Sequence, residues 1–285
     1  YGWCVLLISR GDWNVKNMMS ARNKAVMLGK RKILFFIMMI LMLGGHTVWA
    51  LPAGEQVASG RATFDRQGNN LTVVNTPNTI INWRNFSIQS NEAVRFVQQS
   101  KQSAVLNRIV GQNPSTILGL LQSNGKVFLI NPNGIVFGSG ARIDVQGLIA
   151  STLNISNADF LAGRYLFNAG VKAADIRNQG SITTPAGGMV YLIAPNVTNS
   201  GIITSPQGQV LLAAGHSVKL VDSANPEIAV VVSAPQDSAV NLGRIISKSG
   251  SVGIYGGLVR QAGVVNADSA AKDEQGRIVL RALQS

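Results

Sequence analysis

The stretch GMVYLIAPNVTNSGIITSPQGQVLLAA, residues 188–214, contains a unit that returns along the chain. Its two ends, GMVYLIA and GQVLLAA, each place a Gly and one variable residue before alternating apolar positions, and the two glycines are 20 residues apart. The same phrase occurs as GKVFLI from Gly125, GSVGIYG from Gly250 and GRIVLRA from Gly276. The successive separations indicate three, one, two and one units of about 21 residues.

A second phrase, built on Asn and Gly, lies between these segments. It occurs as NQG at Asn178, NSG at Asn199 and NLG at Asn241, and in altered form as QAG at Gln261. Asn and Gly suit corners because both tolerate left-handed backbone conformations. A strand that pairs with its counterpart one repeat later forms a parallel coil, and about 21 residues supply three short strands and three corners.

The repeat therefore predicts an all-β fold, a right-handed, single-stranded parallel β-helix with corner Asn side chains hydrogen-bonded along the coil. A β-sandwich would also contain short strands, but it would not normally repeat the same residues at this period. Within VYLIA, strand alternation places Val190, Leu192 and Ala194 on one face of the sheet and Tyr191 and Ile193 on the other.

The composition agrees with strands and turns. The 285 residues include 30 Gly, and charged residues make up 13%, which is low for the charged faces of a helical bundle. The formal charge of +12 falls to +6 without the first fifty residues, because they hold seven basic residues and one acidic residue. The remainder has no Lys/Arg run, so nucleic-acid binding has little support, whereas weak contact with an anionic glycan or membrane surface stays open.

Residues 1–50 have the pattern of a secretory leader. A basic cluster at 30–32 precedes an apolar run at 33–43, and GGHTVWA follows. This order predicts a signal peptide at about 22–50 with cleavage after Ala50, preceded by an upstream extension of the reading frame. An eleven-residue apolar run is shorter than the roughly 20 residues needed to span a bilayer.

Two later segments depart from the repeat. Residues 51–110 lack it, and within them the stretch 70–100 alternates apolar and polar positions and carries Trp83, Phe86 and Phe96. Because the end of a β-helix exposes unpaired strand edges, we expect this segment to be an N-terminal cap. The repeats then fill residues 111–285, with an insertion at about 219–240 that we expect to form an extra-helical hairpin.

Together, these features resemble a known family. The leader, the aromatic-bearing cap, the NPNGI motif and the repeated turns are similar to the amino-terminal secretion domain of filamentous-haemagglutinin-type exoproteins in bacterial two-partner secretion. The similarity runs from Leu51 to the end and is most specific to the branch of high-molecular-weight adhesins. Its strongest segments are VFLINPNGIVFGSGARIDVQGLIASTLNIS (127–156), NPEIAVVVSAPQDSAVNLGRIISKSGSVGI (225–254) and NADSAAKDEQGRIVLRA (266–282).

The resemblance implies the secretion domain of a large adhesin, which reaches the cell surface through the periplasm. The implied partner is a cognate outer-membrane β-barrel transporter with periplasmic domains. The transporter-recognition motif of the family maps onto Asn131, Pro132, Asn133, Gly134 and Ile135. We expect these residues to form an exposed turn, although NPNG also suits an ordinary turn between strands. A second family motif, NPNL, has no intact copy, and the nearest text is APNV at 194–197.

Two alternatives remain: a self-contained glycan-binding β-helix and a polysaccharide lyase. A lyase needs clustered carboxylates, whereas the sequence scatters Asp144, Asp159, Asp175, Asp222, Asp237 and Asp268. His216 has no Cys or His partner in the mature sequence for a metal, so we expect a structural or solvent-facing role for it. The sequence predicts no catalytic residue, metal site or cofactor, and we expect the protein not to be an enzyme.

Overall fold

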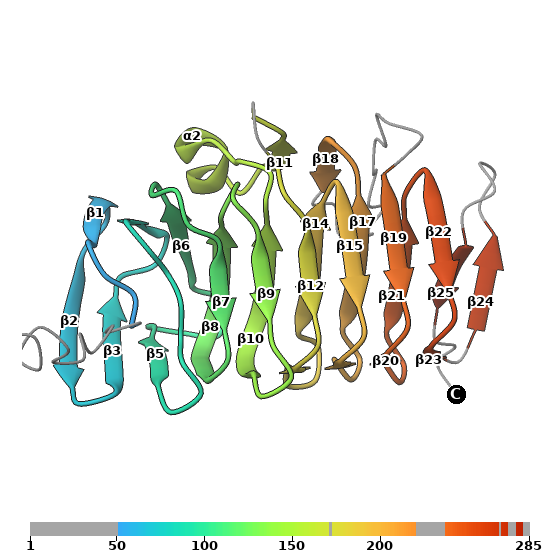
Figure 1. The fold of residues 1–285 in the computed structure, drawn as a ribbon, viewed down its shortest axis with the longest axis horizontal. Helices are drawn as coiled ribbons and strands as arrows, with labels where there is room; N and C mark the ends of the chain where they lie inside the picture. The colour runs from blue at the N-terminus through green and yellow to red at the C-terminus, as the bar shows by residue number, and fades with distance from the viewer. Residues whose placement is uncertain (1–50, 171–172, 221–236, 268, 273–277, 282–285) are drawn as a thin grey trace, which may run out of the picture. The chain divides into compact units, whose positions relative to one another are not determined.

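Strands dominate the computed structural model, and strands of successive turns lie side by side (Figure 1). Two predicted features lie outside the described residues: the leader with its cleavage site at Ala50, and most of the insertion at 219–240. The structure describes residues 51–170, 173–220, 237–267, 269–272 and 278–281.

Each turn of the coil contributes strands to three faces, as the repeat predicts. The first face contains β2 (Ala62–Gln67), β3 (Asn70–Asn75), β5 (Ala93–Val97), the first halves of β8 (Leu120–Ile130) and β10 (Arg142–Ser151), β13 (Ser181–Thr183), β16 (Ile202–Thr204), β20 (Arg244–Ile246) and β23 (Val264–Asn266). The second contains β1 (Gln56–Ser59), β4 (Thr79–Trp83), β6 (Ala104–Ile109), the second halves of β8 and β10, β14 (Met189–Ala194), β17 (Gln209–Ala214) and β21 (Ser251–Tyr255). The third contains β7 (Ser115–Ile117), β9 (Ile135–Phe137), β12 (Ile176–Asn178), β15 (Asn196–Asn199), β19 (Ser238–Asn241) and β22 (Leu258–Gln261).

Two turns of the coil are longer than the rest because each carries an excursion. Leu148 pairs with Val190, 42 residues later, and Val210 pairs with Val252 at the same interval. The first excursion holds α2 (Asn157–Leu161) and β11 (Tyr165–Asn168), and the second begins with β18 (Ser217–Leu220), which pairs antiparallel with β11. None of the described helices is long and apolar enough to cross a membrane.

The excursions show that one predicted number of turns, derived from the spacing of the repeats, is wrong. The interval from Gly125 to Gly188 is not three units, because Lys126 pairs with Gly147 and Gly147 pairs with Met189. It holds two turns, of which the second includes the α2 excursion. An interval that is a multiple of 21 therefore does not count turns, since an insertion of about one repeat length leaves the register of the strands intact.

The last strands depart from the parallel coil. β24 (Ser269–Lys272) and β25 (Ile278–Arg281) pair antiparallel with each other, and β25 also pairs antiparallel with β21. The interpretation of GRIVLRA as a further parallel turn is therefore wrong. Alternating apolar residues specify which side chains share a face, but they do not specify the direction of the strand.

Two hydrophobic clusters lie on opposite sides of the second face. Val190, Leu192 and Ala194 point into the coil, whereas Tyr191 and Ile193 join the outer cluster, as alternation predicts. The excursions supply further members of that outer cluster, Phe160, Phe167 and Val218. The apolar residues on both sides of this face are therefore removed from water, which stabilises the sheet.

The segment 51–110 contains both antiparallel and parallel pairs. β1 pairs antiparallel with β4 and β2 with β3, whereas β3 pairs in parallel with β5 and β4 with β6. A row of edge-to-face and stacked aromatic rings fills the interior here, with centroid distances of 5.7, 5.5 and 6.5 Å along Phe64, Trp83, Phe86 and Phe96. Such pairs add to the stability gained by burial alone.

A ladder of side-chain amides, buried at its three Asn positions, runs along the end of the third-face strands. Asn178 donates through Nδ2 to Oδ1 of Asn199, Asn199 donates in the same way to Asn241, and Asn241 donates to Oε1 of Gln261, each at 2.8 Å. The predicted stacking of corner Asn side chains is confirmed. The altered phrase at Gln261 keeps the bond because its amide is chemically the same group on a longer side chain.

Candidate recognition site

The NPNG motif forms the corner between the second and third faces, where β8 ends and β9 begins. The Asn131 side chain donates through Nδ2 to the carbonyl oxygen of Asn113 and to Oγ of Ser115, both at 3.0 Å. Its Oδ1 accepts a hydrogen bond from the backbone N–H of Asn133 at 3.0 Å. One amide thus closes its own turn and ties that turn to the preceding one.

Asn133 and Gly134 complete this corner. Nδ2 of Asn133 donates to the carbonyl oxygen of Gly111 at 2.9 Å and to Oδ1 of Asn131 at 3.1 Å. The backbone N–H of Gly134 donates to the Asn131 carbonyl at 3.1 Å. Gly134 has φ of +114°, which a residue with a Cβ rarely adopts. Each motif position from 131 to 134, apart from the proline, therefore has a specific backbone or side-chain requirement.

The prediction of an exposed turn is wrong for most of the motif. Asn131 and Ile135 have an exposed fraction of 0%, and Gly134 is also buried. Pro132 and Asn133 are half-buried. The physical reason is that the amide groups face carbonyl oxygens of the neighbouring turn, and Ile135 packs in the core of the coil.

The same corner column continues through later turns. Gly134, Asp175 and Asn196 lie directly before the aligned residues Ile135, Ile176 and Val197, and Asn196 itself pairs with Ser238. Asn196 donates through Nδ2 to Oδ1 of Asp175 at 3.0 Å, and Oγ of Ser238 donates to Oδ1 of Asn196 at 2.9 Å. APNV at 194–197 therefore lies at the same corner as NPNG two turns farther along the coil, shifted by one residue, so that Asn196 aligns with Gly134.

Arg108 anchors the first excursion, a role that the sequence reading missed. Its guanidinium donates to Oδ1 of Asn154 at 3.2 Å, to the carbonyl of Ile155 at 2.6 Å and to Oδ1 of Asn157 at 2.6 Å. Burial lowers the pKa of Arg108 from its ordinary value. A sequence feature that could have indicated this excursion is the helix N-cap at Ser156, whose Oγ accepts a hydrogen bond from the backbone N–H of Asp159 at 3.0 Å.

The start of α2 is also an electrostatic cluster. Oγ of Ser156 donates to the Asp159 carboxylate at 2.6 Å, and Arg164 donates to the same carboxylate at 3.0 Å. The Ser156 hydrogen bond, followed by that from Arg164, lowers the pKa of Asp159. Because the Arg164 side chain is 65% exposed, this ion pair fixes the local geometry of the helix start rather than contributing strongly to stability.

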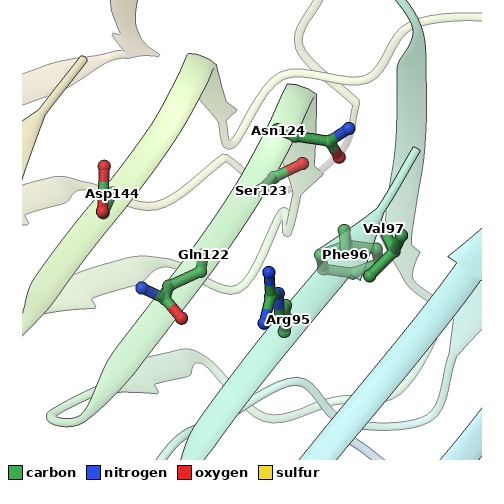
Figure 2. A pocket seen from close by; sticks show the side chains of 7 residues that line it. All are labelled: Arg95, Phe96, Val97, Gln122, Ser123, Asn124 and Asp144. Atoms are coloured by element: carbon green, nitrogen blue, oxygen red, sulfur yellow. The ribbon is translucent and has the colours of Figure 1, made fainter. Parts of the chain in front are cut away.

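A shallow hollow of about 350 Å³ lies on the outer side of the first face (Figure 2). In the strand register Gln122 separates Arg95 from Asp144, so their backbones are two strand spacings, about 10 Å, apart. Among the described residues, no group of three or more His, Cys, Asp or Glu side chains could hold a metal ion. The part of the chain that the structure describes thus shows no clustered Asp/Arg groove of the kind that would favour a lyase.

His216 lies at the base of the second excursion. Its Nε2 is 3.2 Å from Oδ1 of Asp237, and these two residues lie directly before β18 and directly before β19. The side chain of His216 is 45% exposed, whereas that of Asp237 is 6% exposed. The contact connects the two ends of the excursion, which is a structural task.

Comparison with known proteins identifies the family. The model of the TPS secretion domain matches residues 50–283. The chain belongs to the TPS (two-partner secretion) domain family. This TPS domain superposes on the crystal structure of the HMW1 secretion domain from Haemophilus influenzae with a TM-score of 0.74 and 41% identity, covering 78% of this chain and 60% of that one. The predicted family and the β-helix fold are confirmed.

Two curated relatives of the TPS domain are heme/hemopexin-binding proteins of Haemophilus influenzae. One is 35% identical over 177 residues, which are 59% of this chain and 19% of the relative. The other is 36% identical over 100 residues, which are 35% of this chain and 11% of the relative. The aligned part of this chain thus spans a fifth or less of these relatives. Exoproteins with such a domain pass through the periplasm to the cell surface or the extracellular space, and this is the location of the TPS domain.

Proposed function

We propose that this TPS domain targets a large adhesin-type exoprotein for export by binding the periplasmic domains of a cognate outer-membrane transporter. The observation that supports this most directly is the braced NPNG corner, where two side-chain amides hold the preceding turn in place. A corner that is already rigid loses little conformational entropy when a partner binds it.

The proposal is for binding without covalent chemistry. The hollow on the first face separates its charged residues instead of pairing an acid with a base, and the described residues hold no group of metal-ligating side chains. A direct glycan-binding role has weaker support. The aromatic residue that lines this hollow, Phe96, is 1% exposed and so cannot stack on a sugar ring.

We also propose that three segments of the chain have separate roles. Residues 1–50 would act as a cleaved leader, 51–110 would cap the coil, and 111–285 would form the repeats with an insertion at 219–240. The cap has support from its edge strands. Among the described strand pairings, β1 pairs only with β4 and β2 pairs only with β3, so each has one unpaired edge. Exposed charges on β2, including Asp65 and Arg66, disfavour edge-to-edge aggregation.

The test compares Asn133→Ala with Asn196→Ala, because both residues are half-buried and donate side-chain hydrogen bonds at the corner between the second and third faces, two turns apart. Both variants should lose about 1 kcal/mol of unfolding free energy, since each loses side-chain hydrogen bonds. Export of the full chain, measured as the fraction in the medium with and without the cognate transporter, should fall for Asn133→Ala and stay near wild type for Asn196→Ala. Transporter-independent export of the wild type would contradict the proposed function.

A further inference from the structure

The segment Val110–Pro114 lies one turn before the NPNG motif and is more exposed than the motif itself. Val110 is 59% exposed, and Gln112, Asn113 and Pro114 are exposed as well. An apolar residue at each end therefore flanks two primary amides. A single exposed valine is ordinary on a protein surface, so what distinguishes Val110 is its position one turn before the NPNG corner.

The motif holds this segment through its backbone. Asn131 donates to the carbonyl of Asn113, and Asn133 donates to the carbonyl of Gly111. The backbone N–H of Ser115 donates to the Gly134 carbonyl at 2.9 Å. On the other side, a Cβ at Gly111 would lie 1.9 Å from the Arg84 carbonyl, so the segment fits closely against the turn before it. The segment is thus fixed from both sides.

These bonds use the amide donors of the motif inside the protein. Both Nδ2 groups face carbonyl oxygens of the domain, and Asn131 is completely buried. A partner that approaches this corner meets the exposed side chains of Val110 and residues 112–114 first, whereas Pro132 and Asn133 are half-buried. We propose that residues 110–114, positioned by the NPNG motif, form the surface that the transporter contacts. This inference rests on the function proposed above.

The chemistry of the segment limits what it can bind. Residues 109–114, IVGQNP, carry no charge, and the Arg108 guanidinium is engaged by the first excursion. The surface offers amide donors and acceptors between two apolar side chains, which suits peptide groups and apolar side chains of a protein partner. Because the segment itself carries no charge, the affinity should change by no more than about twofold between low and moderate salt.

The first experiment uses Val110→Ser and Gln112→Arg in the full chain, with Leu242→Arg as the matched control. Leu242 is 47% exposed and follows the opposite end of a third-face strand. Substitutions at exposed positions should leave the unfolding midpoint near wild type. Export, and binding of the folded domain to purified periplasmic domains of the cognate transporter, should fall by roughly tenfold for the two segment variants. The control should match the wild type.

A second experiment places a photoreactive amino acid at position 112, 133 or 242 and measures crosslinks to the transporter. The expected result is a strong crosslink from 112 and none from 242. A crosslink from 133 without one from 112, or normal export of both segment variants while Asn133→Ala fails, would overturn this inference and leave the proposed function intact. Export that never depends on the transporter would instead overturn the proposed function.

Discussion

Buried Asn side chains lie at both ends of the third-face strands, and the two sets form hydrogen bonds with different kinds of partner. At the carboxyl ends of these strands, each of Asn178, Asn199 and Asn241 bonds to the amide side chain at the equivalent position one turn later. At the corner before β9, Asn131 bonds to backbone and hydroxyl groups of the preceding turn, and neither partner is an Asn side chain at the equivalent position. A buried corner Asn can therefore continue a hydrogen-bond ladder from turn to turn, or it can hold one particular loop in place. The second arrangement gives that corner a surface different from those of the repeated turns.

The largest expected effect on stability is at the centre of the ladder. Asn199→Ala removes one acceptor and one donor, and it leaves the Nδ2 group of Asn178 and Oδ1 of Asn241 buried without these partners. Each lost partner costs about 1–3 kcal/mol, so the unfolding free energy should fall by about 3 kcal/mol. Urea unfolding measures it. A loss near zero would show that the ladder does not stabilise the coil.

A smaller loss of stability, with a larger loss of export, is expected at the motif. Asn131→Ala removes the brace to Asn113 and Ser115, but Asn133 and the segment 110–114 can turn to water. The unfolding free energy should fall by about 1–2 kcal/mol. Export per folded molecule should fall more than in Asn199→Ala. If the two variants lost export in proportion to stability alone, the distinction between the two corners would fail.

The smallest effect is expected at the end of the ladder. Gln261 accepts from Asn241 at 2.8 Å and donates to the Gly263 carbonyl at 2.9 Å, and its side chain is exposed. Water can replace these partners, so Gln261→Ala should lower the unfolding free energy by less than about 1 kcal/mol. The same urea titration compares it with Asn199→Ala. Equal losses for the two variants would mean that burial does not decide the strength of a ladder bond.

Sequence periodicity predicted the coil well because a β-helix is built from local, repeated choices. Alternation placed Val190 inside and Tyr191 outside, and the Asn-Gly phrases placed the ladder. The direction of β25 was wrong because alternation has no direction, and the α2 excursion was missed because its length is close to one repeat. The HMW1-like fold thus followed from the pattern, whereas the α2 excursion and the direction of β25 did not.

The candidate site was predicted by residue type but not by exposure. NPNG was correctly expected to be a turn, because its residues allow little else between two apolar strands. That Asn131 is buried could not be read from the motif, since its partners Asn113 and Ser115 belong to the preceding turn. A short motif does not reveal which neighbouring backbone groups need donors.

The sequence by itself determined the family, the three-faced coil and the position of the turn, because each depends on residue types at fixed spacing. The tertiary structure alone decided which side chains at that corner are buried and which are exposed. The burial of Asn131 and the exposure of Val110 follow from how two successive turns stack, and stacking depends on hydrogen bonds between residues about 20 positions apart.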